Sequence, residues 1–562
     1  MRYIKKILQK NKIMILFYIG LGIFNSFMSN YKADYFQKVI DGLADRTLSF
    51  VGIVIYGLIL IINYSMNYID QYPGTKLEHG IYLDFKLLAL NKISTIDYME
   101  YQKIGTGKLV QKIENGASAG KNVLFNFWLR LIRELLPTIM FSIYFIWRIN
   151  KSVTYALLIG YVVIFIITNI LLKFLYQIKE KILNNEELLN HYLVRSFMEI
   201  LVFRIGKQFP NEIKKAENAK EDIVSSKVKM TMIHEAFFTI FVLLVAMLDI
   251  IIIIYAWRYN NLSVGSVVSL ISLIENAYMP IAIFNVIYVQ YKLDNSSYSR
   301  FEEFLCSKDD EHLTIGKTLN EDIGEISIKN LNFKYQNREI FDELSLSIKK
   351  GEKVAFVGES GSGKSTLVKL LVGLLKYNKW KIYLGDLELN DICLNELYSK
   401  VSYLSQDAPV FDGTIKENIV FDKNVSNDQI LEALNKMQLS YLLKNSTKGL
   451  DTEIGEKGTC LSGGEKQKLA LSRLWFEDSE LVILDEATSA MDNLTEENVM
   501  REVTNKLNDK TVIAIAHRLN SIIGFDRIVV FQNGKIVGQG TFEELMRTNN
   551  YFVELYNASL QQ

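Results

Sequence analysis

Long apolar stretches alternate with polar segments over the first 305 residues of the chain. Several of these stretches reach the roughly 20 residues that a helix needs to cross the hydrocarbon core of a bilayer. The third stretch is the shortest and begins among Arg130, Arg133 and Glu134, but a fourth follows it directly across the turn at residues 148–151. The pattern predicts six membrane-spanning helices, at residues 14–28, 51–68, 131–147, 153–176, 237–257 and 264–289.

Basic residues at the start of the chain orient these helices. Five of them precede the first span, with no acidic residue among them: Arg2, Lys5, Lys6, Lys10 and Lys12. Because Lys and Arg are enriched on the cytoplasmic side, we expect the N-terminus in the cytoplasm, and six spans return the chain to that side of the cell membrane. A cleaved signal peptide would have a similar start, but residues 25–29 lack the small-residue cleavage pattern.

Two long polar segments follow the second and fourth spans. Residues 69–130 and 177–236 keep a helical spacing of apolar positions, as in Leu188, Leu189 and Tyr192. We expect both segments to continue the membrane helices into the cytoplasm. Residues 1–305 are therefore predicted to form an α-helical transmembrane domain with helical cytoplasmic extensions.

The pattern changes after a polar run at residues 306–322, which we interpret as a linker. Short runs rich in Val, Ile and Leu then predict strands, because they are bounded by turn residues and alternate with helical spacing. These runs occur at residues 326–328, 331–333, 354–357, 481–484 and 511–516. Residues 323–562 are therefore predicted to form a soluble α/β domain.

Composition limits the possible functions. A chain of 562 residues with 49% hydrophobic content is too long for one domain and too apolar for an ordinary soluble enzyme. The 63 basic and 63 acidic residues cancel, so no net charge favours a nucleic acid as partner. Cys306, Cys393 and Cys460 lie far apart without the spacing of a zinc site, and we expect reduced thiols.

A glycine-rich loop at residues 358–365 lies between the expected strand at residues 354–357 and an expected helix that follows the loop. Backbone N–H groups of such a loop surround phosphates, and its Lys reaches the β- and γ-phosphates. The hydroxyl of Ser365 is expected to ligate Mg²⁺. The predicted nucleotide contacts are Gly358, Glu359, Ser360, Gly361, Ser362, Gly363, Lys364, Ser365 and Thr366.

Two further motifs follow this loop: Leu-Ser-Gly-Gly-Glu-Lys-Gln at residues 461–467, and the acidic pair Asp485 and Glu486 at the end of an expected strand. The three pieces in this order resemble the ATP-binding cassette (ABC) family, in which residues 461–467 would be the signature sequence. The resemblance implies a P-loop NTPase domain with a helical subdomain, and ATP and Mg²⁺ as cofactors. It also implies that Ser462, Gly463 and Gly464 touch the γ-phosphate of an ATP that another cassette holds.

The acidic pair would supply the metal ligand and the base. In the family, Asp485 would hold Mg²⁺ through its water shell, and Glu486 would polarise the water that attacks the γ-phosphate. Residues 487–492 resemble the D-loop, with Met491 where Leu is usual, and Asp492 is expected near the nucleotide. Two acids at a strand end are often only a solvated loop, and the D-loop resemblance favours the functional interpretation.

Three single residues gain a role from the same resemblance. Tyr335 lies where an aromatic ring stacks on adenine, Gln406 lies in the Q-loop beside the metal site, and His517 lies at the switch position that contacts the γ-phosphate. Gln406 would also ligate the metal. Each has an ordinary alternative, since a strand-end Tyr is usually packed, a lone His is usually structural and a loop Gln alone means little.

The direction of transport and the coupling to the membrane rest on weaker resemblances. Residues 452–458 resemble the X-loop of exporters. Residues 96–101 and 199–204 resemble the intracellular segments of exporter-type (type IV) membrane domains, which would place coupling helices near residues 113–121 and 198–206. The alternative is solvated helical hairpins without a role in transmission.

The resemblance implies an ATP-driven exporter that carries a peptide, a drug-like molecule or another amphipathic substrate. We expect a homodimer, and a heterodimer with a second half-transporter remains open. Glu275 and Asp249 lie in the sixth and fifth spans, where ionisable groups usually face a water-filled cavity or a partner. Alternative functions are import of a metal chelate, lipid flipping and an ATP-gated channel.

Overall fold

The computed structural model describes residues 2–259, 262–319, 322–335, 338–377, 381–421, 423–444, 448–455, 458–516 and 518–560. The chain forms two compact units. The first, here called the membrane unit, comprises residues 1–94 and 104–307, and the second, here called the ATP-binding unit, comprises residues 95–103 and 308–562. The short segment at residues 95–103 therefore belongs to the ATP-binding unit although it lies within the N-terminal half of the sequence.

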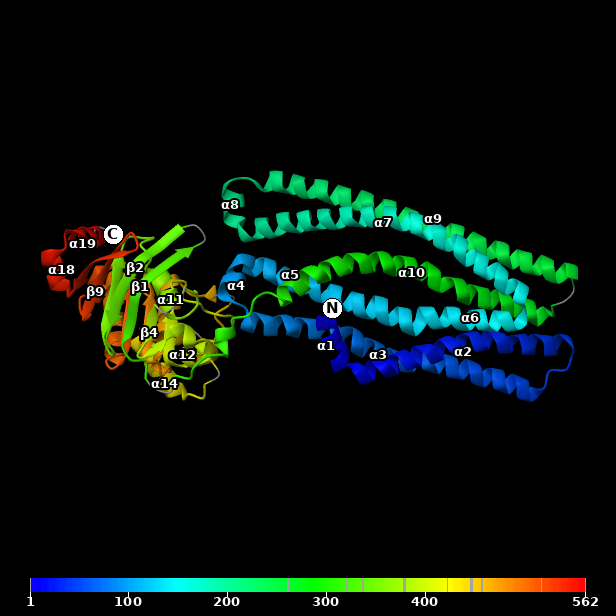
Figure 1. The fold of residues 1–562 in the computed structure, drawn as a ribbon, viewed down its shortest axis with the longest axis horizontal. Coiled ribbons are helices and arrows are strands. Elements are labelled where there is room, and N and C mark those ends of the chain that lie inside the picture. The colour runs from blue at the N-terminus through cyan, green and yellow to red at the C-terminus, as the bar shows by residue number, and fades with distance from the viewer. Residues whose placement is uncertain are drawn as a thin grey trace. The chain divides into compact units, whose positions relative to one another are not determined.

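Long helices make up the membrane unit (Figure 1). Its α-helices are α1 (Arg2–Lys10), α2 (Lys12–Ala44), α3 (Phe50–Thr95), α5 (Thr106–Lys121), α6 (Leu136–Ile149), α7 (Lys151–Met198), α8 (Ile200–Ile205), α9 (Phe209–Tyr259) and α10 (Val264–Leu305). Two π-helical segments, Asn122–Leu129 and Leu131–Leu135, join α5 to α6. The rods α7 and α9 pack side by side and are joined at one end by the short α8.

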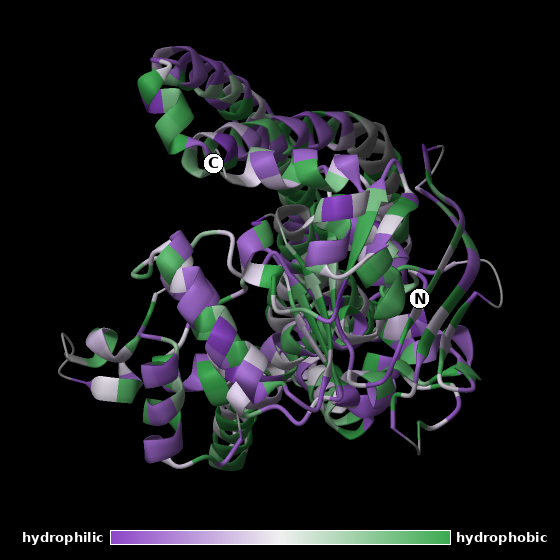
Figure 2. Ribbon diagram, turned by 90° about the vertical axis from the view of Figure 1, so that its left-hand side faces the viewer, coloured by the Kyte–Doolittle hydropathy of each residue, from purple (hydrophilic) through white to green (hydrophobic). Residues whose placement is uncertain are grey.

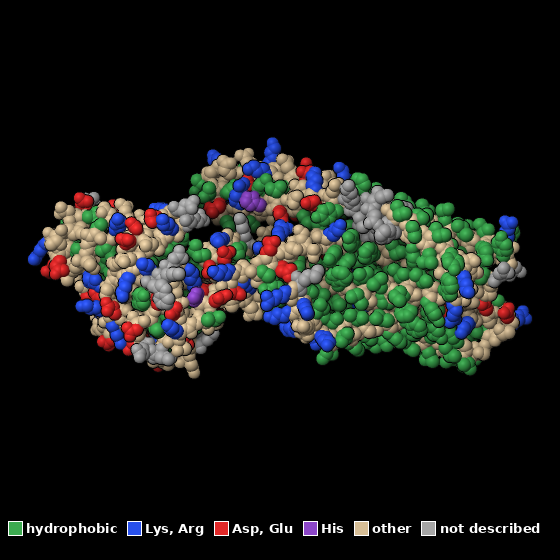
Figure 3. Space-filling model, viewed as in Figure 1, with side chains coloured by type: hydrophobic (Ala, Val, Ile, Leu, Met, Phe, Trp, Pro, Cys, Tyr) green, Lys and Arg blue, Asp and Glu red, His purple; other side chains and the backbone are tan. Residues whose placement is uncertain are grey.

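Four of these helices are long and apolar enough to cross a membrane, counted over the described residues: α2, α3, α9 and α10. The third expected span is divided between the π-helical Leu131–Leu135 and α6, and the fourth lies in α7, where Lys151–Ile164 forms a shorter apolar stretch. Hydrophobic side chains cover a broad band of this unit on the face that Figure 3 shows. An apolar surface of this kind suits lipid, and the protein is a multi-pass membrane protein.

Several polar side chains lie between the helices of this unit. On α2, Ser26, Asn30 and Asp34 are buried. Ser142 donates a hydrogen bond to Asn30 at 2.7 Å, and Arg148 donates to both carboxylate oxygens of Asp34 at 2.8 and 2.9 Å. These contacts join α2 to α6 and satisfy polar groups that lipid could not.

The charges at the start of the third expected span are paired. Arg133 forms an ion pair with Asp70 of α3 and donates a hydrogen bond to the hydroxyl of Tyr18 at 2.6 Å. Arg130 pairs with Glu134 one turn away, at 3.2 Å. Arg133 therefore joins the third expected span to α2 and α3, whereas Arg130 and Glu134 pair within the span.

One of the two expected coupling turns is in the wrong place. Residues 113–121 lie inside the continuous helix α5, and the chain instead reverses at α4 (Tyr98–Ile104) and Gly105. Residues 69–130 keep a helical spacing of apolar positions, which gives no signal for a turn. The second expected turn agrees with the structure, because α8 occupies residues 200–205 between α7 and α9.

Two sheets organise the ATP-binding unit. Strands β2 (Arg338–Ile348), β1 (Ile326–Tyr335), β4 (Ile382–Leu384) and β5 (Leu387–Glu388) form an antiparallel sheet in that order. The second sheet has the order β10 (Lys535–Gly540), β9 (Arg527–Gln532), β3 (Lys353–Gly358), β8 (Thr511–Ile515), β7 (Leu481–Asp485) and β6 (Val401–Leu404). Only the edge pair β9 and β10 is antiparallel in this sheet.

Helices surround the sheets of this unit. They are α4, α11 (Lys364–Leu371), α12 (Leu394–Lys400), α13 (Ile415–Val420), α14 (Asn427–Lys436), α15 (Ser440–Lys444), α16 (Gly463–Ser472), α17 (Asn493–Lys506), α18 (Phe542–Thr548) and α19 (Asn550–Leu560). Tyr98 and Met99 of α4 pack against the hydrophobic core of the unit. The segment before the expected coupling turn is therefore part of the ATP-binding fold.

The sheet is buried on both faces, which explains the uninterrupted apolar runs in the sequence. Strands β7 and β8 are buried along their whole length. Along β3, Ala355 and Val357 join one hydrophobic cluster while Val354 and Phe356 join another, because successive side chains point to opposite faces. Figure 2 shows the strands as hydrophobic ribbons among helices that carry hydrophilic residues. The carboxyl ends of β3, β7 and β8 thus meet at one edge.

Candidate functional site

The glycine-rich loop follows β3 and ends at α11. Gly363 has a φ of +106°, and a Cβ atom on Gly358 would lie 2.1 Å from the carbonyl oxygen of Phe531, so both positions require glycine. The side chain of Lys364 curls back over the loop and donates to the carbonyl oxygens of Gly358 at 2.7 Å and Glu359 at 2.9 Å. Burial lowers the pKa of the Lys364 ammonium, against the opposite effect of nearby carboxylates.

The expected metal ligands Ser365 and Asp485 meet at this edge. The hydroxyl of Ser365 donates to Oδ1 of Asp485 at 3.0 Å, and the hydroxyl of Tyr403 donates to Oδ2 at 3.2 Å. Burial raises the pKa of Asp485, and the two hydrogen bonds oppose that shift. A hydroxyl and a carboxylate are oxygen donors of the kind that Mg²⁺ prefers. Among the described residues no cluster of three His, Cys, Asp or Glu side chains could hold a metal alone.

Glu486 and Gln406 lie at the same place. Nε2 of Gln406 donates to Oε2 of Glu486 at 2.5 Å, and Glu486 adopts a left-handed backbone conformation with φ of +54°. Both residues line a cavity of about 510 Å³. Its other lining residues are Arg338, Ile340, Ser360, Gly361, Gly363, Lys364, Ser365 and Thr366.

The signature residues are absent from the described lining of this cavity. Ser462 instead begins α16, where its hydroxyl accepts a hydrogen bond from the N–H of Glu465 and the Glu465 carboxylate accepts one from the N–H of Ser462. Glu465 thus completes a capping box with Ser462 at the start of α16. Within one chain, the loop and the signature are separate halves of an expected site.

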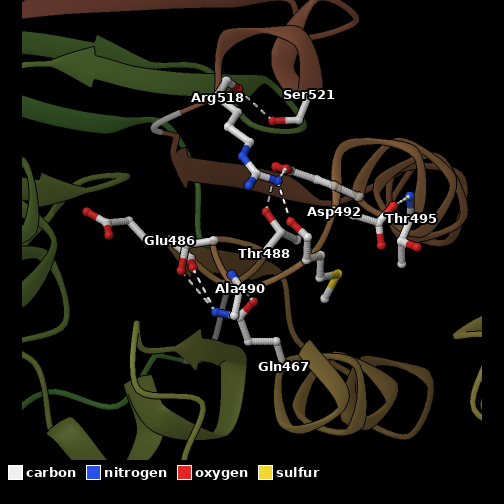
Figure 4. A network of polar contacts seen from close by, with 11 residues as sticks. Gln467, Glu486, Thr488, Ala490, Asp492, Thr495, Arg518 and Ser521 are labelled. Carbon is white, nitrogen blue, oxygen red and sulfur yellow. Dashed lines mark hydrogen bonds and ion pairs between the residues drawn. The ribbon is translucent and has the colours of Figure 1, made fainter. Parts of the chain in front are cut away.

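The remaining expected contacts have mixed outcomes. Asp492 caps α17 by accepting a hydrogen bond from the N–H of Thr495 at 2.9 Å (Figure 4), which lowers its pKa. Tyr335 ends β1 and packs edge-on against Phe333, with the ring centroids 5.2 Å apart, and it is not among the residues that line the cavity. His517 lies outside the described residues.

A family model, described as ABC transporter, matches residues 341–489. This range contains the glycine-rich loop, the signature and the acidic pair, whose geometry is described above. The chain belongs to the ABC transporters. It is a half-transporter, because one membrane unit and one ATP-binding unit are fused in a single polypeptide, and a domain of this family uses ATP with Mg²⁺.

Relatives match this half-transporter over different lengths. It is 44% identical over 244 residues to the ATP-dependent permease MDL1 of Candida albicans, an alignment that covers 42% of this chain and 36% of that protein. It is 26% identical over 511 residues to the ATP-dependent lipid A-core flippase of Pseudomonas aeruginosa, covering 88% of this chain and 83% of the flippase. The solved structure of a bacterial Atm1-family ABC exporter with ATP bound shares the fold, with a TM-score of 0.78, 21% identity and 98% of each chain covered.

In the half-transporter, the expected X-loop contacts the segment that follows the expected Q-loop. Thr414 and Glu453 form an antiparallel bridge, and the N–H of Ile454 donates to the carbonyl oxygen of Gly413 at 3.0 Å. Glu456 and Lys457 lie outside the described residues. Two motifs that the sequence places about 40 residues apart are therefore neighbours.

The membrane acids of the half-transporter differ in their surroundings. Glu275 of α10 is exposed, whereas Oδ1 of Asp249 on α9 is buried without a hydrogen-bond partner among the described residues. The structure places both in the expected spans, on helices that contact each other.

Sequence reasoning missed Tyr403, Gln467 and Arg518. Tyr403 contacts Asp485, and the other two contact the loop that follows Glu486. Tyr403 had a detectable signal, because it lies three residues before Gln406 of the expected Q-loop. Gln467 lies within the signature run, but only the structure shows that its side chain turns back to its own chain.

Proposed function

We propose that two copies of this chain form an ATP-driven exporter that moves a peptide, a drug-like molecule or another amphipathic substrate out of the cell. The observation that carries the proposal is the divided site: the cavity beside Lys364 and Glu486 contains no signature residue among its described lining. A second copy in a two-fold arrangement would supply Ser462, Gly463 and Gly464 to that cavity, and each chain would complete the other.

The proposed hydrolysis uses the groups at the sheet edge. Lys364 would exchange its bonds to loop carbonyl oxygens for bonds to the β- and γ-phosphates, and Ser365 and Asp485 would hold Mg²⁺, whose charge would neutralise that of the phosphates. Glu486 leaves Gln406 and accepts a proton from the water that attacks the γ-phosphate. Bound ATP would hold the dimer closed, and its hydrolysis would release it.

Exposed apolar residues on and beside α8 support a partner for this end of the membrane unit. Phe197, Met198, Leu201 and Val202 are 81%, 67%, 69% and 63% exposed. Polar neighbours such as Lys207 and Gln208 indicate water rather than lipid around them. An apolar patch in water marks a contact surface, and we propose that it docks on the ATP-binding unit of the partner chain.

The substrate pathway is proposed to include Glu275 and Asp249. An acid exposed on a membrane helix is stabilised by water or by a cation, so Glu275 favours cationic or amphipathic cargo. Lipid flipping is a second candidate, favoured by the relative from Pseudomonas aeruginosa that matches across both units. Import of a metal chelate is the third and has no specific support in the described residues.

Reconstitution in lipid vesicles tests the proposal. Purified protein would be placed in vesicles with the ATP-binding unit outward, and ATP hydrolysis would be screened against peptides, cationic dyes and lipids. An exporter would accumulate a stimulating compound in the lumen when Mg²⁺ and ATP are added outside. Emptying of preloaded vesicles would show an importer, and label transfer between leaflets without lumenal uptake would show a flippase.

A further inference from the structure

The side chain of Gln467 joins two functional segments of one chain. It lies on α16, a turn after Gly463, and is only 4% exposed. Nε2 donates to Oγ of Ser489 at 3.0 Å and approaches the carbonyl oxygen of Glu486 at 3.5 Å. Oε1 accepts a hydrogen bond from the N–H of Ala490 at 2.8 Å (Figure 4). Both ends of the carboxamide therefore hold the loop at residues 486–490.

The signature glycines pack on the same loop. A Cβ atom on Gly463 would lie 3.2 Å from Cβ of Ala490, and one on Gly464 would lie 3.1 Å from the carbonyl oxygen of Ala490. The start of α16 cannot move far relative to this loop without losing these contacts, because close-packed surfaces deform little.

The opposite side of the loop is fixed to the rest of the domain. Arg518 donates hydrogen bonds to the carbonyl oxygen of Met491 and, at 2.9 Å, to Oε2 of Glu496. Thr488 donates to Oε1 of Glu496 at 2.8 Å. Figure 4 shows the loop between the Gln467 side chain and the Arg518 side chain. The contacts therefore connect α16, through this loop, to Glu486 and to α17.

We propose that Gln467 is a positioning residue that links the two ATP sites of the dimer. The inference rests on the proposed function, in which the signature of one chain contacts the ATP held by its partner. Gln467 then connects that signature to Glu486 of its own chain, which serves the other ATP. Binding of ATP at one site thereby changes the position of the Glu486 carboxylate at the second site. The dimer contains this link twice, once in each chain.

Mixed dimers separate this role from simpler ones. One chain carries Glu486→Gln, so a single hydrolytic site remains, built from the intact chain's P-loop and Glu486 and the other chain's signature. Gln467→Met, which keeps the length and removes the hydrogen bonds, is then placed on either chain, and single-turnover phosphate release is measured. Lys468→Met, on the next position of α16, is the matched control because its side chain has no hydrogen bond to the loop among the described residues.

We expect Gln467→Met on either chain to slow phosphate release about tenfold, equivalent to about 1.4 kcal/mol. ATP affinity, thermal midpoint and dimer content should match the Lys468→Met control. Gln467→Glu, which keeps an acceptor for the N–H of Ala490, should recover part of the rate. In intact homodimers Gln467→Met should also lower the Hill coefficient for ATP towards one.

Three results would overturn the link. If Gln467→Met slows phosphate release only when it is on the intact chain, Gln467 merely positions Glu486 of its own chain. If it slows phosphate release only when it is on the Glu486→Gln chain, Gln467 merely positions the signature. No loss on either chain would show that the contacts are structural. A parent protein that neither dimerises nor hydrolyses ATP would overturn the proposed function, and this inference with it, before Gln467 is changed.

Discussion

The membrane unit and the ATP-binding unit pair polar side chains for different purposes. In the membrane unit, Asp34 with Arg148 and Asp70 with Arg133 join one helix to another. In the ATP-binding unit, the Lys364 ammonium bonds to loop carbonyl oxygens and Gln406 bonds to Glu486. The first contacts hold helices in position. The contacts in the ATP-binding unit involve side chains that a bound nucleotide would also need, so a ligand can replace them.

The difference follows from the solvent around each unit. In hydrocarbon no water can replace a lost hydrogen-bond partner, so breaking a polar contact there costs much free energy and the contact persists. At the sheet edge the cavity of about 510 Å³ admits water and ligand, so contacts there can be exchanged at a modest free-energy cost. Substitutions in the membrane unit should therefore lower stability, whereas substitutions in the ATP-binding unit should lower ATP hydrolysis.

The largest effect is expected for Glu486→Gln in the ATP-binding unit. Removing the proposed base should lower ATP hydrolysis about a thousandfold while ATP binding persists, because the amide keeps the shape of the side chain but accepts no proton. Phosphate release and equilibrium nucleotide binding would be measured on the purified protein. Glu497→Gln, an exposed residue of α17, should leave both unchanged. Unchanged hydrolysis in Glu486→Gln would place the base elsewhere.

In the membrane unit, Arg133→Met should cost stability rather than chemistry. The substitution leaves the buried Asp70 carboxylate without its cation, and the free energy of unfolding should fall by about 3 kcal/mol. Combining it with Asp70→Leu should recover most of the loss. Denaturation in detergent would measure both.

Arg130→Met provides the matched control for this pair. Arg130 and Glu134 are 41% and 43% exposed, so losing their ion pair should change stability by less than about 1 kcal/mol. Equal losses for Arg130→Met and Arg133→Met would contradict the view that buried pairs hold this unit together.

The two units also differ in how far their sequences predict them. In the ATP-binding unit, residues 354–357, 481–484 and 511–516 become the adjacent strands β3, β7 and β8, as expected. Uninterrupted apolar runs bounded by glycine or acid are specific to strands buried on both faces. The expected strands at residues 326–328 and 331–333 prove to be one, β1, with a left-handed residue at Asn330 between them.

The membrane unit gives a weaker signal. Helical periodicity shows that residues 69–130 are helical but not where the chain turns, so α4 was expected about fifteen residues too late. The partners of Arg133 could not be predicted either, since Tyr18 and Asp70 lie 115 and 63 residues away. Tertiary pairing of this kind leaves no local pattern. The role of each nucleotide-site residue stays a prediction that the geometry supports.

A smaller effect in the ATP-binding unit should follow Tyr403→Phe. The phenol hydroxyl donates to Oδ2 of Asp485 and orients the expected metal ligand, so its loss should weaken the Mg²⁺ dependence of hydrolysis about tenfold. The Mg²⁺ concentration for half-maximal activity would be measured at saturating ATP. Tyr398→Phe, on the preceding helix, should leave it unchanged. A lower maximal rate at the same Mg²⁺ dependence would argue for a packing role.

The smallest effect is expected where the membrane unit meets its cargo. Glu275 is exposed, so its attraction for a cation is screened by water and contributes less than about 1 kcal/mol. Glu275→Gln should therefore raise the half-saturating concentration of a permanently cationic dye about threefold, with a neutral analogue and basal ATP hydrolysis unaffected. Asp249→Asn, at the other proposed pathway acid, should raise this concentration less than Glu275→Gln does, since Oδ1 of Asp249 is buried. Identical dye transport by Glu275→Gln and parent, at matched hydrolysis rates, would remove Glu275 from the pathway and leave the cargo site to other side chains.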